Sequence, residues 1–121
     1  MILVDTSIWI DHFHRAEPHL IDLLTADEVG CHPLVIEEVA LGSLSRRDDT
    51  IALLENLSAF PLLSHDELIG LVDRRRLWGR GLSPTDAHLL GSVRLVGGAR
   101  LWTRDKRLHA AAVELDIAAV D

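Results

Sequence analysis

The feature that most restricts the fold of this chain is an alternation between short apolar runs and longer stretches with helical periodicity. Short apolar runs bounded by turn residues are typical of buried strands. Since parallel strands need crossover connections, which are usually helices, this order predicts an α/β fold with a parallel sheet. The predicted strands are 2–4, 28–31, 60–63 and 99–103, with 117–120 as a candidate fifth.

The predicted helices follow from the same alternation and from capping signals. Ser64 is followed by Glu67 in a capping-box pattern, and Ser83 is followed by a proline suited to a first helical turn. The expected helices are 6–14, 18–25, 33–44, 48–58, 64–78, 83–97 and 106–115.

Composition limits the class of protein. A chain of 121 residues with 48% hydrophobic residues suits one globular domain, and no apolar run or leader-like segment predicts a membrane span or a signal peptide. The single cysteine, Cys31, excludes an internal disulfide and fits a reducing cytoplasm; we expect it to be buried and inert. Arginine outnumbers lysine, as in proteins of GC-rich genomes.

Two aspartates follow the carboxyl ends of predicted parallel strands. Asp5 directly follows the first predicted strand, and Asp105 follows the strand at 99–103 after one intervening residue. The carboxyl ends of parallel strands lie at the sheet edge where open α/β folds bind ligands. Either aspartate can also cap the helix after it, and the two roles are compatible.

Further acids stand out on predicted helices. The segment 33–44 is almost wholly apolar, so burial of Glu37 or Glu38 would be costly unless the carboxylate is paired, neutral or bound to a metal. The helical wheel does not choose between them, and either can instead reach solvent. Asp86 is the third residue after the Ser83 cap, where an acid favours the helix dipole and also points towards the sheet edge.

Carboxylates that converge at one edge favour a divalent cation. Carboxylates that lie close together repel one another, and this repulsion raises their pKa values. A hard ion such as Mg²⁺ relieves the repulsion. Because Mg²⁺ also binds substrate phosphates, such a site suits hydrolysis of a phosphodiester bond. The net charge of −7 argues against a broad basic face that coats nucleic acid, but a metal ion can supply the positive charge that a nuclease needs.

Four motifs in order, LVDTS, EVALG, SPTDAHLL and LWTRDKRL, resemble the PIN-domain ribonucleases and, within them, the VapC toxins of toxin–antitoxin pairs. Each motif is weakly specific alone, whereas the four together are strongly specific. The resemblance implies one PIN-like domain over 1–121, with a central parallel sheet of four to five short strands flanked by helices. It also implies an endoribonuclease that uses Mg²⁺ or Mn²⁺, cuts tRNA or ribosomal RNA, and is blocked by a VapB antitoxin.

The resemblance assigns roles to particular residues. The acids that would bind the metal and carry catalysis are Asp5, Glu38, Asp86 and Asp105. Glu38 is preferred to Glu37 on resemblance alone, because Gly42 follows it after four residues. The hydroxyl groups expected to orient a carboxylate or a metal-bound water are those of Thr6, Ser7 and Thr103. Many relatives have a further acid where Arg107 stands, so a second metal would be weakly held here.

Two surfaces are also predicted. The segment DRRRLWGRG at 73–81 surrounds Trp78 with arginines, and its expected RNA-facing residues are Arg74, Arg75, Arg76 and Arg80, with a solvated helix end as the alternative. Trp9 and Phe13 lie in a dense apolar segment, which together with the family habit predicts a groove for an antitoxin. The resemblance also implies a homodimer or a toxin–antitoxin hetero-oligomer in the bacterial cytoplasm.

Other functional classes fit the sequence less well. The seven histidines show no i,i+4 pair, so we expect surface or capping roles rather than a zinc site. A receiver-like domain would need an acid beside Asp5 and a suitable late lysine, whereas Thr6 and the single Lys106 are present. A DxD phosphatase would need an acid at Ser7. A PIN fold that only binds a partner stays open, and a nuclease assay with and without Mg²⁺ separates it from an enzyme.

Overall fold

The computed structural model of the chain describes residues 1–120. Within them, four parallel strands form one sheet in the order β3-β2-β1-β4. The strands are β1 (Ile2–Val4), β2 (Val29–Cys31), β3 (Ser58–Ala59) and β4 (Arg100–Trp102). Leu3 is paired with Gly30 of β2 and with Leu101 of β4, so β1 is an inner strand. The parallel sheet confirms the predicted α/β class.

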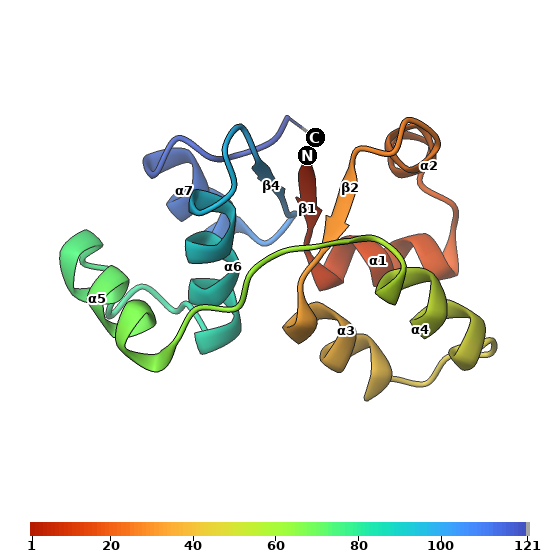
Figure 1. Ribbon diagram of the computed structural model, residues 1–121, viewed down its shortest axis with the longest axis horizontal. Helices are drawn as coiled ribbons and strands as arrows, with labels where there is room; N and C mark the ends of the chain where they lie inside the picture. Colours follow the sequence, from red (N-terminus) through yellow and green to blue (C-terminus); the bar gives the residue numbers. More distant parts are fainter. Residues whose placement is uncertain (121) are drawn as a thin grey trace.

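Helices connect and cover the strands. Those of residues 1–120 are α1 (Thr6–His14), α2 (Pro18–Thr25), α3 (Pro33–Ala40), α4 (Arg47–Glu55), α5 (His65–Arg75), α6 (Pro84–Arg94) and α7 (Lys106–Glu114). Figure 1 shows α1 to α4 gathered on one side of β1 and α5 to α7 on the other. α6 packs against β4, α5 and α7, while α3 packs against α1 and α4. None of the helices in the described part of the chain is long and apolar enough to span a lipid bilayer.

Both predicted serine caps are confirmed. Ser64 Oγ accepts a hydrogen bond from the Glu67 backbone N–H at 3.1 Å, and Glu67 Oε1 accepts one from the Ser64 N–H at 2.9 Å. Ser83 and Asp86 make the same reciprocal pair at the start of α6. The structure shortens α5, which ends at Arg75 rather than near Trp78, because the next residue, the C-cap Arg76, is in the left-handed region with φ 53°.

The third strand was predicted at 60–63, and this was wrong. The strand is Ser58–Ala59, which pairs with Gly30 and Cys31 of β2. Phe60 still donates its N–H to the Cys31 carbonyl at 2.9 Å, but Pro61 has no N–H to continue the ladder. Phe60 and Leu63 are therefore buried by their side chains after the strand has ended.

Two other predicted elements are shorter in the structure. The candidate strand at 117–120 is a single parallel bridge between Leu101 and Ala118. The helix predicted over 33–44 ends at Ala40, before Gly42. Its burial was also overestimated, since only Val35 and Val39 of α3 are fully buried.

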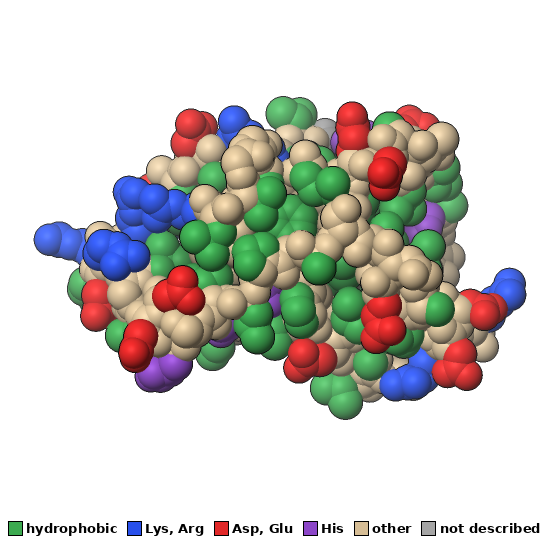
Figure 2. All heavy atoms as spheres, viewed as in Figure 1, with side chains coloured by type: hydrophobic (Ala, Val, Ile, Leu, Met, Phe, Trp, Pro, Cys, Tyr) green, Lys and Arg blue, Asp and Glu red, His purple; other side chains and the backbone are tan. Residues whose placement is uncertain are grey.

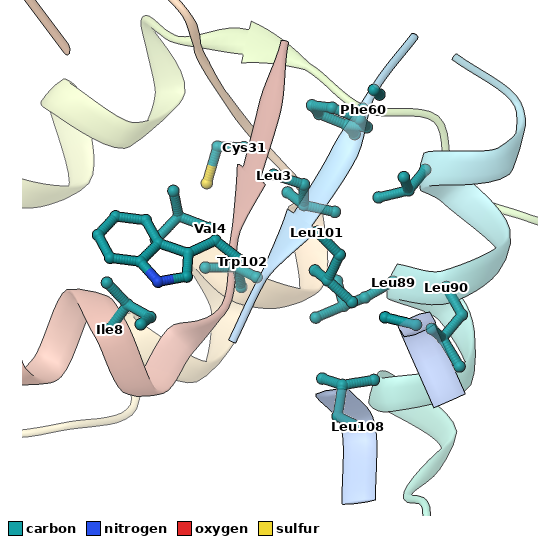
Figure 3. Packing of buried hydrophobic residues seen from close by; sticks show 14 of the residues in the cluster. Leu3, Val4, Ile8, Cys31, Phe60, Leu89, Leu90, Leu101, Trp102 and Leu108 are labelled. Atoms are coloured by element: carbon teal, nitrogen blue, oxygen red, sulfur yellow. The ribbon is translucent and has the colours of Figure 1, made fainter. Parts of the chain in front are cut away.

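One apolar core lies between the sheet and its helices. Leu3 and Val4 of β1 and Leu101 of β4 have no exposed surface. Figure 3 shows these side chains packed between Ile8 of α1 and the α6 leucines. Each fully buried Leu or Ile contributes about 1.5–3 kcal/mol relative to an exposed one. This packing fixes the strand ends, and with them the positions of the acids that follow.

Candidate active site at the carboxyl edge of the sheet

Asp5 lies at the centre of the candidate site. Its backbone N–H continues the ladder of β1 by donating to the Trp102 carbonyl of β4 at 2.9 Å. Its side chain caps α1, because Oδ1 accepts from the Thr6 N–H at 2.8 Å. The residue is 9% exposed. Asp5 thus ends a strand and caps a helix, the two compatible roles that the sequence left open.

Two hydroxyl groups hold the other oxygen of Asp5. Ser7 Oγ donates to Oδ2 at 2.9 Å and Thr103 Oγ1 donates to the same oxygen at 2.7 Å. Thr103 Oγ1 also accepts the Asp105 N–H at 3.1 Å, which joins β1, β4 and the start of α7. The Thr6 hydroxyl is buried and has no hydrogen-bond partner within residues 1–120. The structure therefore gives Ser7 and Thr103 an orienting contact, whereas Thr6 uses only its backbone.

Asp105 is the N-cap of α7, and Asp86 completes the capping box that begins at Ser83 of α6. Asp105 Oδ1 accepts from the Leu108 N–H at 2.9 Å, and Asp86 Oδ2 accepts from the Ser83 N–H at 2.9 Å. Each carboxylate keeps its second oxygen out of the cap. Because helix N-termini stabilise negative charge, the caps favour ionised carboxylates where a cation could bind.

The electrostatics link the three aspartates. Burial raises the pKa of Asp86 above its ordinary value, the hydrogen bonds from Ser83 oppose this, and the charges of Asp5 and Asp105 raise it further. Repulsion of this kind is the effect that a divalent cation relieves. The structure thus brings three of the four predicted acids into one electrostatic neighbourhood.

Glu38 does not share that environment. Both Glu37 and Glu38 are exposed on α3, so neither is a buried carboxylate, and of the two alternatives left open by the sequence the structure shows that they reach solvent. The physical reason is that α3 is buried along one stripe only, with Val35 and Val39, and the acids occupy the open side. The choice between Glu37 and Glu38 stays a prediction based on resemblance.

The fit of a divalent metal rests on the donor set. Oxygen ligands from carboxylates suit Mg²⁺ or Mn²⁺, and the pKa of Asp86 is raised first by burial and then by the charges of Asp5 and Asp105. Across residues 1–120, no group of three or more His, Cys, Asp or Glu side chains is already close enough to hold an ion. The carboxylate oxygens are therefore the type of ligand that a hard cation prefers. The side chains that carry them are held by hydrogen bonds at helix N-termini and are not yet close together around one ion.

Arg104 makes a network that the sequence did not reveal. Its guanidinium binds Glu17 with two contacts, Nη1 to Oε1 at 2.7 Å and Nη2 to Oε2 at 2.9 Å, and reaches Asp11 Oδ2 at 3.3 Å. Its Cζ atom also lies 5.7 Å from the centre of the Trp102 ring. Because Arg104 stands between Thr103 and Asp105, this network fixes the loop that carries both. No local signal could predict partners 87 and 93 residues away.

A pair of histidines was also missed. His32 is fully buried and caps α3, with Nδ1 accepting from the Leu34 N–H at 3.0 Å. Its ring centre lies 6.3 Å from that of His88. Burial, together with His88, lowers the pKa of His32 to about 4, against the opposing effect of the Pro61 carbonyl. His32 caps a helix, as the sequence predicted for the histidines, but its burial beside His88 was not foreseen.

The arginine segment is divided by the structure. Arg80 Nη2 forms an ion pair with Glu114 Oε2 of α7 at 2.8 Å. One of the four arginines predicted to face RNA therefore already has an acidic partner within the chain. Arg74, Arg75 and Arg76 are exposed, as is Trp78. The RNA-facing role of these residues stays a prediction.

The predicted partner groove needs one correction. Trp9 is 0% exposed and belongs to the core, where it stacks on Phe13 with ring centres 6.0 Å apart, so it cannot line a groove. The reason is its position one residue after the buried Ile8, on the side of α1 that faces the core. Phe13 is half-buried and does line a cavity of about 660 Å³ between α1 and the loop after α3. Its apolar walls include Ile10 and Leu44.

Comparison with known proteins shows the family to which the chain belongs. The family model described as PIN domain matches residues 2–114. Two curated relatives, both named Ribonuclease VapC32 and both from Mycobacterium tuberculosis (strains CDC 1551 / Oshkosh and ATCC 25618 / H37Rv), are 64% identical over 118 residues, covering 98% of this chain and 95% of theirs.

A solved structure shares the fold. The crystal structure of PAE2754 from Pyrobaculum aerophilum matches with a TM-score of 0.65, covering 98% of this chain and 87% of that chain. At 18% identity, this similarity supports the arrangement of strands and helices alone.

Proposed function

Because the chain belongs to the PIN domain family and is a close relative of VapC ribonucleases, we propose that it is a ribonuclease toxin of a toxin–antitoxin pair. It hydrolyses phosphodiester bonds within cellular RNA, in the bacterial cytoplasm, with Mg²⁺ or Mn²⁺ as its cofactor. Its substrate is tRNA or ribosomal RNA, and its cleavage inhibits translation.

The observation that carries this proposal is the placement of three acids, Asp5, Asp86 and Asp105, at the starts of α1, α6 and α7, near enough for the charges of Asp5 and Asp105 to act on Asp86. Burial is the main cause of the raised pKa of Asp86 and the charges of Asp5 and Asp105 add to it, whereas the hydrogen bonds from Ser83 lower it. A site that receives a cation accounts for both the caps and the repulsion.

The residues of the chain have distinct tasks in this proposal. Asp5, Asp86 and Asp105 would hold the metal, and Glu38 would complete the set from α3. When bound, the ion would activate water and stabilise charge on the phosphate. Ser7 and Thr103 keep the Asp5 carboxylate in one orientation through their bonds to Oδ2. Arg104 holds the loop that carries Thr103 and Asp105 against Glu17. This contact would keep Asp105 in a fixed position relative to Asp5.

The antitoxin would bind beside Phe13. The cavity between α1 and the loop after α3 is lined by Phe13, Ile10 and Leu44 and by the cation Arg46. An apolar segment with an acidic flank fits these walls. A VapB-type antitoxin bound there would lie next to α3, the helix that carries Glu38.

The test is RNA cleavage by the purified, antitoxin-free protein. Total cellular RNA is incubated with Mg²⁺, with Mn²⁺ and with EDTA, using the wild type, Asp5→Asn, Glu38→Gln and, as a matched control, Glu37→Gln. We expect discrete, metal-dependent cuts that Asp5→Asn and Glu38→Gln lose and Glu37→Gln retains.

The outcomes separate the competing functions. Equal loss in Glu37→Gln and Glu38→Gln would remove the special role of Glu38. No cutting by a folded wild type that binds Mn²⁺ and the antitoxin would contradict the ribonuclease and favour a PIN fold that acts only as a binding module.

A further inference from the structure

Two histidines meet where the two sides of the molecule join. His32 follows β2 and caps α3, whereas His88 lies in the second turn of α6. The helices α3 and α6 lie on opposite sides of β1 (Figure 1), yet the two imidazole rings have their centres 6.3 Å apart. The rings therefore connect the helix that carries Glu38 with the helix that carries Asp86.

The register of the sheet places His32 beside the candidate active site. Leu3 of β1 pairs with Gly30 of β2, and the same parallel register continued by two residues sets His32 next to Asp5. Both His32 and Asp5 leave the end of a strand and cap the helix that follows. His32 is fully buried. It therefore belongs to the same edge of the sheet as the acids, although the proposed mechanism gives it no task.

Each ring has one buried nitrogen without a hydrogen-bond partner in residues 1–120, Nε2 of His32 and Nδ1 of His88. Burial and the neighbouring His88 lower the pKa of His32 to about 4, so the ring is neutral at pH 7. Its Nδ1 accepts the Leu34 N–H at 3.0 Å, which places the single proton of the neutral ring on Nε2 as a donor. A buried donor without an acceptor destabilises a fold, so the two nitrogens favour a common partner.

A third polar group lies near the rings. The Pro61 carbonyl opposes the effect of burial on the pKa of His32, and Ser92 Oγ donates to the same carbonyl at 2.6 Å. Ser92 stands four residues after His88, so both lie on one face of α6. Figure 2 shows mainly hydrophobic and backbone atoms where the two sides of the molecule meet, with charged side chains to either side. The two rings and the carbonyl are thus a small polar cluster in an apolar setting, and three partners are typical of a buried water.

We propose that His32 and His88 are positioning residues of the active site, joined by one buried water molecule between Nε2 and Nδ1. The link fixes α6 against the end of β2, and so it sets the distance from Asp86 to Asp5. The capping box cannot do this, because it fixes Asp86 only relative to α6 itself. The inference rests on the proposed function, in which these acids bind the metal.

A transition metal fits the pair less well than water. Zinc takes four protein ligands in structural sites and three in catalytic ones, whereas the two rings supply two nitrogens. No third His, Cys, Asp or Glu joins them within the part of the chain that the structure describes. Binding of zinc is therefore an alternative outcome of the test.

The test measures Mn²⁺ affinity by calorimetry at pH 7.5, without RNA, in variants that break or keep the link. His32→Asn keeps an acceptor for the cap of α3 but does not reach His88, and His88→Leu removes Nδ1. His88→Asn keeps an amide about where Nδ1 stands. We expect the Kd for Mn²⁺ to rise about tenfold in His32→Asn and in His88→Leu, and to stay within about twofold of the wild type in His88→Asn. The double variant His32→Asn with His88→Leu should bind no more weakly than either single variant, because each single change already breaks the same link.

Two controls separate positioning from a general loss of stability. His65→Leu replaces an exposed histidine at the start of α5, and Leu20→Ala leaves a cavity in the core beside α2. Both should bind Mn²⁺ as the wild type does, even though Leu20→Ala melts at a lower temperature. Circular dichroism verifies that every variant is folded at the temperature of the titration.

The outcomes are distinct. Wild-type affinity in His32→Asn or His88→Leu, an equal loss in His88→Asn and His88→Leu, losses that add in the double variant, or a tenfold loss in Leu20→Ala would each overturn the positioning role. Zn²⁺ that binds the wild type and Asp5→Asn alike, but not His88→Leu, would instead assign the pair to a metal. A wild type that binds neither Mn²⁺ nor Mg²⁺ would contradict the proposed function as well, whereas the other outcomes leave that function standing.

Discussion

Thr103 Oγ1 donates a 2.7 Å hydrogen bond to Asp5 Oδ2 and so joins the ends of β4 and β1 across 98 positions of sequence. Both residues are buried. A buried hydrogen bond to a charged group contributes about 1.5–3 kcal/mol. The bond therefore both stabilises the fold and orients the first acid of the site.

Replacement of Thr103 separates these two effects. Thr103→Val should lower the free energy of unfolding in urea by about 2 kcal/mol, because Asp5 loses a donor in a buried setting. RNA cleavage should fall with it. Thr103→Ser keeps the hydroxyl and should retain most of the activity. Equal activity of the Val and Ser variants would show that the hydroxyl does not orient Asp5.

The network of Arg104 should matter more for activity than for stability. Its pair with Glu17 is partly exposed, so solvent screening limits its contribution to about 1 kcal/mol. Arg104→Ala should weaken Mn²⁺ binding, measured by calorimetry, since the loop from Thr103 to Asp105 loses its anchor. Arg100→Ala, which removes an exposed ion pair between the first residue of β4 and Asp116 after α7, is the control. Unchanged Mn²⁺ affinity in Arg104→Ala would exclude the positioning role.

Asp86 should make the metal-free protein sensitive to pH. Because its pKa is raised in the folded state, its protonated form favours the fold, and that stabilisation is present at low pH and lost as pH rises through the folded-state pKa. Added Mn²⁺ should restore stability at neutral pH, and at a hundred times Kd a ligand adds about 2.7 kcal/mol.

The matched variant for this prediction is Asp86→Asn, which keeps an oxygen for the Ser83 N–H. We expect it to melt higher than the metal-free wild type at pH 7 and to lose the rise in Tm with Mn²⁺. A full Mn²⁺ response in Asp86→Asn would place the ion elsewhere.

Trp9 and Phe13 should respond differently to truncation. Trp9→Ala should reduce the free energy of unfolding by about 3–5 kcal/mol, because the ring is wholly buried. Phe13→Ala should leave a folded protein whose affinity for its antitoxin, measured by calorimetry, is reduced. Ile21→Ala removes an exposed apolar residue from α2 and is the control. Unchanged antitoxin affinity in Phe13→Ala would reject the groove.

Local sequence signals predicted the parts of the site that depend on local structure. Asp5, Asp86 and Asp105 all follow a strand end or a cap, and these features are set by residues within a few positions. The order of strands and helices was predictable for the same reason. Their meeting at one edge followed from the parallel sheet.

The rest depended on packing between distant segments. The sequence left open whether Glu38 is buried or exposed, since an apolar helix does not reveal which of its sides the fold covers. Trp9 was misplaced for the same reason, and β3 was displaced because Pro61 ends the ladder while Phe60 and Leu63 are buried by side-chain packing. Arg104 and Glu17 meet only after folding.

His32 should add a second, opposite dependence on pH. Its pKa is lowered to about 4 in the folded protein, below the ordinary 6.5, so the unfolded chain binds a proton that the fold excludes. The contribution of His32 to the free energy of unfolding should be constant above pH 6.5. It should fall between pH 6.5 and 4, by about 2–3 kcal/mol at the lower end. His32→Asn keeps a side chain that can cap α3 but cannot titrate. Urea denaturation of both proteins at pH 7.5 and 4.5 should therefore show a smaller loss in the variant. Parallel losses would mean that the carboxylates alone cause the acid sensitivity and that His32 is protonated in the fold.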